Sequence, residues 1–169
     1  MDSTRAGQGM MTIAVILGMA MLTWYFGGVE EKQRNPNADP QSLIHLNSVE
    51  VPLKRNRLGH YLVNGIINGR EVEFLLDTGA TDVVVPETTA KRLGLAYGRR
   101  GQAMTANGAV TVYQTRIDEL QIGEIKLYNI TASINPAMSS GAILLGMSAL
   151  GQIEFSQQGN TLTLRQHSG

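Results

Sequence analysis

Asp77, Thr78 and Gly79 are the residues with the clearest potential for chemistry, and they directly follow the apolar run Phe74-Leu75-Leu76. Aspartate is strongly depleted from strands and is seldom buried unless it is paired or functional. Thr78 places a hydroxyl beside the carboxylate, and Gly79 lacks the Cβ that would keep a second backbone or a substrate away. An ordinary turn is the simpler explanation for the tripeptide alone, whereas its sequence context favours a carboxylate used in acid–base chemistry.

Two further segments follow this loop. Asn107-Gly108 lies between two runs of strand type, and Ile143-Leu144-Leu145-Gly146 places a glycine after an apolar run. Residues 67–80 resemble the strand, hairpin and active-site loop of the retropepsin family of aspartic proteases. Asn107-Gly108 resembles the tip of the family's flap, and residues 143–146 resemble its second signature. The resemblance covers about residues 49–164 in the expected order, and it looks like the bacterial membrane-anchored branch of the family.

Two positions depart from the viral members of that family. The viral proteases usually pair an aspartate that closely follows the alanine of the active-site loop with an arginine directly after the second-signature glycine. Here Thr81 follows Ala80, and Met147 follows Gly146. Loss of both partners avoids leaving one buried charge unpaired. We therefore expect a different support for the loop and a different dimer contact, with activity retained.

The resemblance implies an aspartic endopeptidase, whose chemistry needs two carboxylates that share a proton. Of the five aspartates, only Asp77 precedes a Thr-Gly pair; the others are Asp2, Asp39, Asp82 and Asp118. A complete dyad therefore requires Asp77 from two copies related by a two-fold axis. We predict a homodimer that cleaves polypeptide substrates without a metal or another cofactor.

The resemblance also assigns roles to individual residues. The catalytic group is Asp77 with its neighbours Thr78 and Gly79, under a mobile hairpin tip at Asn107-Gly108. The residues expected to contact the substrate lie beside the loop, at the hairpin tip and in the second signature: Ala80, Asp82, Met104, Ala106, Asn107, Gly108, Ala109, Leu145 and Gly146.

Short strands must position these residues, because beyond residue 48 the apolar pattern has period two or comes in short β-branched runs. Asn68-Gly69 predicts one hairpin between strands at 60–67 and 71–76, and Asn107-Gly108 predicts another between 103–106 and 109–113. Further strands are predicted near 115–122, 125–134, 142–145, 152–155 and 161–165. A helix from Pro86 ends at Gly94, and a second short helix follows Gly146. The predicted fold is all-β, a closed barrel or folded sheet with one or two short helices.

Residues 10–26 form an apolar run without a charged residue, and Gly27-Gly28 extend it. At about 1.5 Å per residue, such a helix just spans a hydrocarbon core of roughly 30 Å. Trp24 and Tyr25 lie at its far end, where amphipathic rings favour the membrane–water boundary. A cleaved signal peptide is the alternative, but the bulky Trp24-Tyr25-Phe26 end makes a poor cleavage site. We therefore predict one uncleaved transmembrane helix.

The predicted organisation is a tail at 1–9, an anchor at 10–28, a linker at 29–48 and a protease domain at 49–166. The linker contains two prolines and several amides, and it is predicted to hold the domain off the bilayer. Counting lysine and arginine gives no clear orientation. Because the short tail carries little that folds, we favour the tail inside and the domain exported, which in a bacterium means the periplasmic face of the inner membrane.

Composition, charge and motif spacing argue against several other classes of protein function. The 14 basic and 14 acidic residues cancel, so nucleic acid is not an expected partner. The chain has no cysteine, and His45, His60 and His167 lack metal-ligand spacing. Residues 146–150 lack the final glycine of a serine nucleophile elbow. The remaining alternative is a non-catalytic peptide-binding or dimerisation module on the same fold, and the intact Asp-Thr-Gly favours the enzyme.

Overall fold

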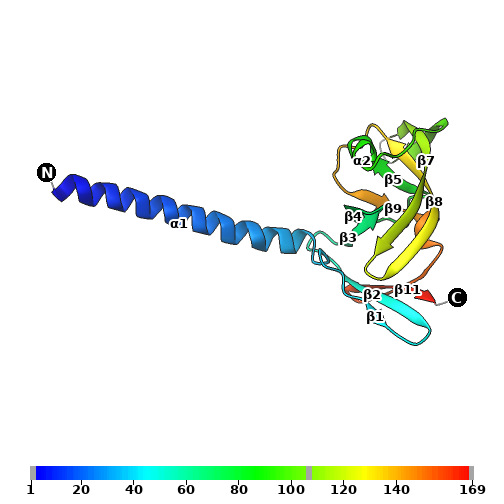
Figure 1. The fold of residues 1–169 in the computed structure, drawn as a ribbon, viewed down its shortest axis with the longest axis horizontal. Helices are drawn as coiled ribbons and strands as arrows, with labels where there is room; N and C mark the ends of the chain where they lie inside the picture. Colours follow the sequence, from blue (N-terminus) through cyan, green and yellow to red (C-terminus); the bar gives the residue numbers. More distant parts are fainter. Residues whose placement is uncertain (1–2, 106–107, 168–169) are drawn as a thin grey trace.

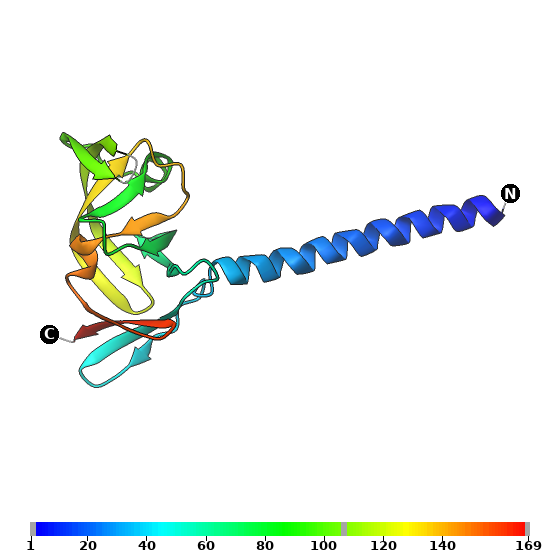
Figure 2. The same cartoon turned by 180° about the vertical axis from the view of Figure 1, so that it is seen from behind.

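The computed structural model describes residues 3–105 and 108–167, which form one long helix and a β domain. The helix α1 (Ser3–Arg34) projects away from the domain as a single rod, and the C-terminal strand ends on the side of the domain away from it (Figure 1). The same arrangement is seen from behind in Figure 2. From Gly9 to Arg34 the helix is long and apolar enough to cross a membrane, and its apolar window is not buried within the chain.

Helix α1 continues beyond the predicted end of the anchor at Gly28. Lys32 and Arg34 occupy its last turn, where cations interact favourably with the helix dipole. Arg34 also pairs with Glu31 at 2.8 Å, three residues earlier. The helix ends just before Asn35-Pro36, as expected because the residue before a proline is disfavoured in helical conformation.

The predicted linker at 29–48 is not an extended tether in this structure. Its first residues are helical, Asn35 and Asn37 are buried at 2% and 5% exposure, and Leu43–Ile44 form strand β1. Amide side chains that read as linker composition in the sequence are here paired with backbone groups of the domain. Composition alone does not reveal such tertiary pairing, because it depends on which distant backbone groups lie nearby.

Seven strands form the main sheet, in the order β3-β4-β9-β5-β8-β7-β6. An additional pairing of β3 with β7, which joins Ile67 to Leu120, closes the sheet into a barrel. This confirms the predicted all-β fold. The strands are β3 (Leu62–Ile67), β4 (Arg70–Leu76), β5 (Val83–Pro86), β6 (Arg100–Thr105), β7 (Gly108–Ile122), β8 (Ile125–Asn135) and β9 (Ile143–Leu145).

Four strands form a second, antiparallel sheet in the order β1-β2-β11-β10. It consists of β1, β2 (Ser48–Lys54), β10 (Glu154–Gln158) and β11 (Thr161–His167). Neither β1 nor β2 is predicted by the local sequence pattern. Strand β2 contains Pro52, which lowers its strand signal, and it is specified by pairing with the distant β11.

Local turn and helix signals were read correctly. Asn68 and Gly69 have φ of 48° and 78°, as a tight hairpin turn between β3 and β4 requires. Helix α2 (Glu87–Leu93) ends at Gly94 in the left-handed conformation, and α3 (Met147–Leu150) follows Gly146. Gly108 pairs with Thr105 and is the first residue of β7, so this strand begins one position before the predicted strand at 109–113.

The core of the domain joins both sheets to α2. Val51 and Leu164 of the four-stranded sheet are fully buried together with Phe74 and Ile143 of the barrel and Ala90 of α2. Strand β4 therefore has one face locked in the core, and it is this strand that leads into Asp77.

Candidate active site

Asp77 follows the last residue of β4 and lies beside the end of β9. The two strands run parallel, with Leu76 opposite Leu145, and the Asp77 N–H donates to the Leu145 carbonyl at 3.1 Å. On the other side, the Leu76 N–H donates to the Tyr61 carbonyl at 3.0 Å. The backbone that carries the carboxylate is thus fixed from both neighbouring segments, while the Asp77 side chain stays partly exposed.

The loop after Asp77 turns back on the carboxylate. The Gly79 N–H donates to Asp77 Oδ1 at 2.9 Å, and the Ala80 N–H donates to the Asp77 carbonyl at 3.2 Å. A Cβ on Gly79 would lie 3.2 Å from the same carboxylate oxygen. Thr78 and Gly79 are exposed at the surface of the chain. The loop therefore presents a hydrogen-bonded carboxylate and a small backbone surface next to it.

The first residues of α3 hold the far side of this loop. The Met147 N–H donates to the Ala80 carbonyl at 2.9 Å, and the Ser148 N–H donates to the Thr81 carbonyl at 2.8 Å. Gly146 makes this approach possible, because a Cβ there would lie 2.7 Å from the Ala80 carbonyl oxygen and would also overlap the Asp82 carbonyl oxygen. Backbone hydrogen bonds thus support the loop where Thr81 and Met147 depart from the viral charge pair.

Ser148, which the sequence pattern argued against as a nucleophile, supports the loop through its hydroxyl. Its hydroxyl donates to the Thr131 carbonyl at 2.7 Å and accepts from the Val83 N–H at 3.0 Å. It therefore joins α3 to β5 and lies close to β8. No local motif reveals this role, because both partners are backbone groups far away in the sequence.

A row of partly exposed apolar side chains lies next to Asp77. Leu144 of β9 is in register with Leu75 of β4 and with Val84 of β5, so these three side chains share one face. Asp77 follows Leu75 by two positions and continues on the same face, because side chains alternate along a strand. The row forms an apolar surface beside the carboxylate, and none of its three residues was predicted from the sequence as a site residue.

Leu145 was predicted to contact the substrate, but its side chain is only 1% exposed and packs in the core. Its carbonyl positions Asp77 instead. The apolar run at 143–145 indicated a buried strand, whereas the alternation that turns Leu144 outward becomes visible only with the strand pairing.

The predicted flap is a hairpin of β6 and β7, with Met104 opposite Ala109 and Thr105 opposite Gly108. Met104 is 83% exposed, and Gly108 has φ of 105°. Ala106 and Asn107, both predicted to contact substrate, lie outside the described residues. Hydrogen bonds join Asp77 to Leu145 and Ala80 to Met147, and the backbone of Gly146 packs against the carbonyls of Ala80 and Asp82.

The base of this hairpin is tied to α2. The ring of Tyr97, just before β6, packs edge-on against Tyr113 of β7 at 5.4 Å between centroids, and its hydroxyl donates to Glu87 at 3.3 Å. Desolvation, followed by the charge of Glu87, raises the pKa of Tyr97 above its ordinary value. Tyr97 therefore remains a neutral hydrogen-bond donor well above neutral pH.

Comparisons with known proteins agree with this geometry. A sequence model of the family described as "gag-polyprotein putative aspartyl protease" matches residues 63–152. A crystal structure of a retropepsin-like aspartic protease from Rickettsia conorii superposes with a TM-score of 0.61 at 28% identity, covering 74% of this chain and 98% of that one.

Two curated sequences are also similar. An uncharacterized protein from the cobV 5' region of a Sinorhizobium species is 31% identical over 64% of this chain and 48% of its own length. An uncharacterized protein of Rickettsia prowazekii (strain Madrid E) is 30% identical over 60% of this chain and 44% of its own. The chain thus spans about half the length of the curated relatives it matches.

Proposed function

Because this chain belongs to the retropepsin-like aspartic protease family, we propose that it is an aspartic endopeptidase whose catalytic carboxylate is Asp77. The observation that carries the proposal is the Asp77 loop itself. Its backbone is held by β9 and by the start of α3, while the carboxylate stays partly exposed beside an apolar row. A solvated turn does not need this support from two other elements.

The second carboxylate of the dyad comes from a second copy of the chain. One chain supplies a single Asp-Thr-Gly motif, and the exposed Thr78 and Gly79 allow two loops to approach across a two-fold axis. Two carboxylates this close share one proton, because both cannot ionise together. Neither copy alone holds a complete acid–base pair.

Hydrolysis then follows from the shared proton. The ionised carboxylate takes a proton from water as the water oxygen bonds to the peptide carbonyl carbon, and the protonated carboxyl gives its proton to the carbonyl oxygen. The C–N bond then breaks as the nitrogen receives a proton from one carboxyl of the dyad, while a hydroxyl of the tetrahedral diol returns its proton to the other carboxylate and re-forms the C=O bond. This releases a carboxylic acid and an amine and leaves the dyad with one proton, as at the start. Thr78 and Gly79 border the carboxylate, and Leu75, Val84 and Leu144 receive an apolar substrate side chain.

The substrate contacts expected from the sequence are kept in this proposal. Ala80, Asp82 and Gly146 border the loop, and Met104, Gly108 and Ala109 belong to the hairpin that would close over a bound peptide. Leu145 contributes through its carbonyl contact with Asp77. Helix α1 is the membrane anchor in this proposal, with the β domain on the periplasmic face of a bacterial inner membrane.

The test compares the full chain with its Asp77→Asn variant in detergent micelles, using unfolded β-casein at pH 4–7. We expect at least about a hundredfold loss of cleavage, because the substitution removes both acid–base groups. Asp118→Asn, an exposed position on β7, is the matched control and should cleave normally. Normal cleavage by a folded Asp77→Asn variant contradicts the proposal, and binding without cleavage by the unmodified chain supports the peptide-binding alternative.

Assembly is tested separately by diluting the full chain in detergent. Specific activity should fall once the dimer dissociates, and sedimentation should report the dimer fraction in the same samples. Reconstitution into liposomes should reduce this loss, because confinement to a bilayer raises the effective concentration. Constant specific activity in a sample that is monomeric refutes the shared dyad.

A further inference from the structure

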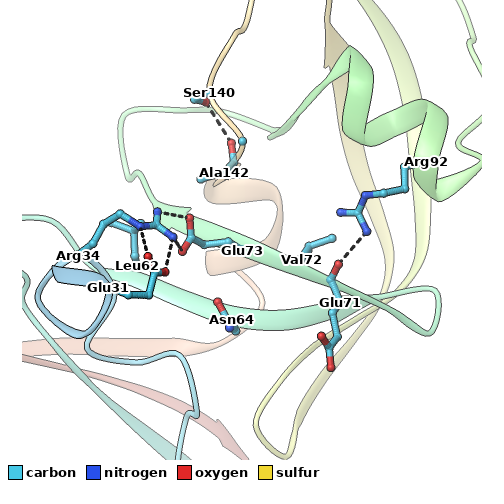
Figure 3. A pocket seen from close by; sticks show the side chains of 11 residues that line it. Glu31, Arg34, Leu62, Asn64, Glu71, Val72, Glu73, Arg92, Ser140 and Ala142 are labelled. Atoms are coloured by element: carbon cyan, nitrogen blue, oxygen red, sulfur yellow. Dashed lines mark hydrogen bonds and ion pairs between the residues drawn. The ribbon is translucent and has the colours of Figure 1, made fainter. Parts of the chain in front are cut away.

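The end of helix α1 is attached directly to the β domain, without a flexible spacer. The Nη1 and Nη2 groups of Arg34 each donate to the Glu73 carboxylate at 2.8 Å, and the Arg34 carbonyl accepts from the Asn56 side chain at 2.9 Å. Figure 3 shows Arg34 reaching from the helix to Glu73 on β4, with Glu31 beside it. The last helical residue is therefore already a contact residue of the domain.

Asn35 and Asn37, which follow directly, add further hydrogen bonds between the helix end and the domain. The Asn35 side chain donates to Asn64 at 2.9 Å and to Glu73 at 3.0 Å. The Asn37 amide donates to the carbonyls of Lys54 and Leu62 at 2.9 and 2.6 Å, and its oxygen accepts from the Lys54 N–H at 2.6 Å. Asn37 thus bridges β2 and β3 from a buried position. We name residues 34–37 with these partners the junction.

The junction contacts the same part of the barrel that carries Asp77. Glu73 lies on β4 four residues before Asp77, and Leu62 lies on the neighbouring β3. A pocket of about 560 Å³ separates Arg34 from Ser140 and Ala142, which directly precede β9 (Figure 3). The anchor is therefore fixed to β4, which leads into Asp77, to the neighbouring β3, and also to β2 of the second sheet.

This attachment sets the height of the domain above a bilayer. If the apolar segment ends near Val29, Glu30–Arg34 add about 7.5 Å of helix, which matches a headgroup layer of roughly 5–7.5 Å. A domain of this size has a radius of gyration of about 14 Å, so its far side lies roughly 35 Å away. An extended linker of about 20 residues would instead allow a reach of up to about 70 Å.

We propose that the junction holds the Asp77 site at a fixed short distance from the bilayer, so that the substrates are juxtamembrane segments of polypeptides anchored in the same membrane. This inference rests on the proposed protease function and adds the substrate class. A segment of about ten extended residues reaches roughly 35 Å, so a substrate cut within this distance needs no long spacer.

The test uses reporters made of one transmembrane helix, a Gly-Ser spacer of 10, 20, 40 or 80 residues and an unfolded β-casein segment. Each is reconstituted with the full chain in liposomes. We expect the cleavage rate to fall about twentyfold from the 10-residue to the 80-residue spacer, because effective concentration falls roughly as the −3/2 power of length. Soluble β-casein is cleaved in parallel as a reference.

Two variants of equal length make the test specific. A 40-residue Gly-Ser insertion between Gly28 and Val29 leaves the junction intact but frees the domain, so the same fall should shrink to about fourfold. A 40-residue insertion of Glu-Ala-Ala-Ala-Lys repeats raises the domain by about 60 Å, so spacers below about 18 residues should no longer be cut. Both variants should cleave soluble β-casein like the unmodified chain.

The outcomes separate the two proposals. A spacer profile for the unmodified chain as flat as that of the Gly-Ser insertion, with soluble β-casein cleaved equally by both, overturns the juxtamembrane inference and leaves the protease intact. Absence of β-casein cleavage by the unmodified chain overturns the protease function itself and with it the inference. A steep profile that both insertions change as described supports the inference.

Discussion

The Asp77 loop and the junction at residues 34–37 are both held by hydrogen bonds to distant segments, but by different groups. In the loop, backbone N–H groups of Asp77, Met147 and Ser148 pair with backbone carbonyls. In the junction, side chains of Arg34 and Asn37 pair with backbone groups and with Glu73. The loop depends mainly on glycine at a position where backbones approach closely, whereas the junction depends on which side chains are present.

This difference predicts that the loop and the junction are sensitive to different kinds of substitution. A site built from backbone contacts around Gly146 tolerates many neighbouring side chains but no added Cβ at the glycine. A junction built from amides tolerates added volume at its exposed edge but not the loss of a buried donor or acceptor. The two regions should therefore fail under opposite kinds of substitution, which the following measurements on the full chain in micelles examine.

Gly146→Ala should have the largest effect. The new Cβ would meet carbonyl oxygens of Ala80 and Asp82, which are backbone atoms that cannot swing aside. We expect a loss of about 3 kcal/mol or more in the free energy of unfolding. Denaturant unfolding followed by circular dichroism measures this, and Gly141→Ala, with open space at its Cβ, should change stability by less than about 0.5 kcal/mol. Equal effects at both glycines contradict the packing argument.

Asn37→Ala should cost about 2–3 kcal/mol, because it leaves the Lys54 N–H and the Lys54 and Leu62 carbonyls without this partner. The same unfolding experiment applies. The exposed Asn47→Ala is the matched control, with an expected change below about 0.5 kcal/mol. If Asn37→Ala is as mild as the control, the junction is not a structural contact and the juxtamembrane inference loses its basis.

Ser148→Ala should cost about 1–2 kcal/mol, since its hydroxyl bridges the Val83 N–H and the Thr131 carbonyl. It should also lower kcat for β-casein more than it raises KM, because it loosens the support of the catalytic loop and not the substrate surface. Ser156→Ala, on the exposed β10, controls for the loss of a hydroxyl. Unchanged kcat with reduced stability assigns Ser148 a purely structural role.

The smallest effect is expected for the pair Arg34 and Glu73. A double-mutant cycle with Arg34→Gln and Glu73→Gln should give a coupling of about 0.5–1 kcal/mol, because the Arg34 side chain is about half exposed. Raising the salt concentration from 50 mM to 500 mM should reduce this coupling. A salt-independent coupling above about 2 kcal/mol would mean that the pair is effectively buried and that the junction is stiffer than its exposure indicates.

The sequence predicted the parts of the fold that short-range rules govern. Positive φ at Asn68-Gly69, the helix end at Gly94 and the helix after Gly146 follow from local backbone preferences, and the structure confirms them. The missed strand β2 depends on pairing with β11, which lies more than a hundred residues away, and β1 pairs in turn with β2. Single-segment propensity contains no information about such partners.

For the candidate site, the sequence by itself determined that Asp77 stands in a glycine-containing loop after a buried strand and that a second glycine motif accompanies it. The tertiary structure decided that Leu144 and not Leu145 is partly exposed beside Asp77, that Ser148 supports the loop, and that Asn35 and Asn37 fix the helix to the domain. The physical reason is that glycine and aspartate act through local backbone geometry. The side of a strand that is exposed, and the partners of a buried amide, depend instead on which strands become neighbours.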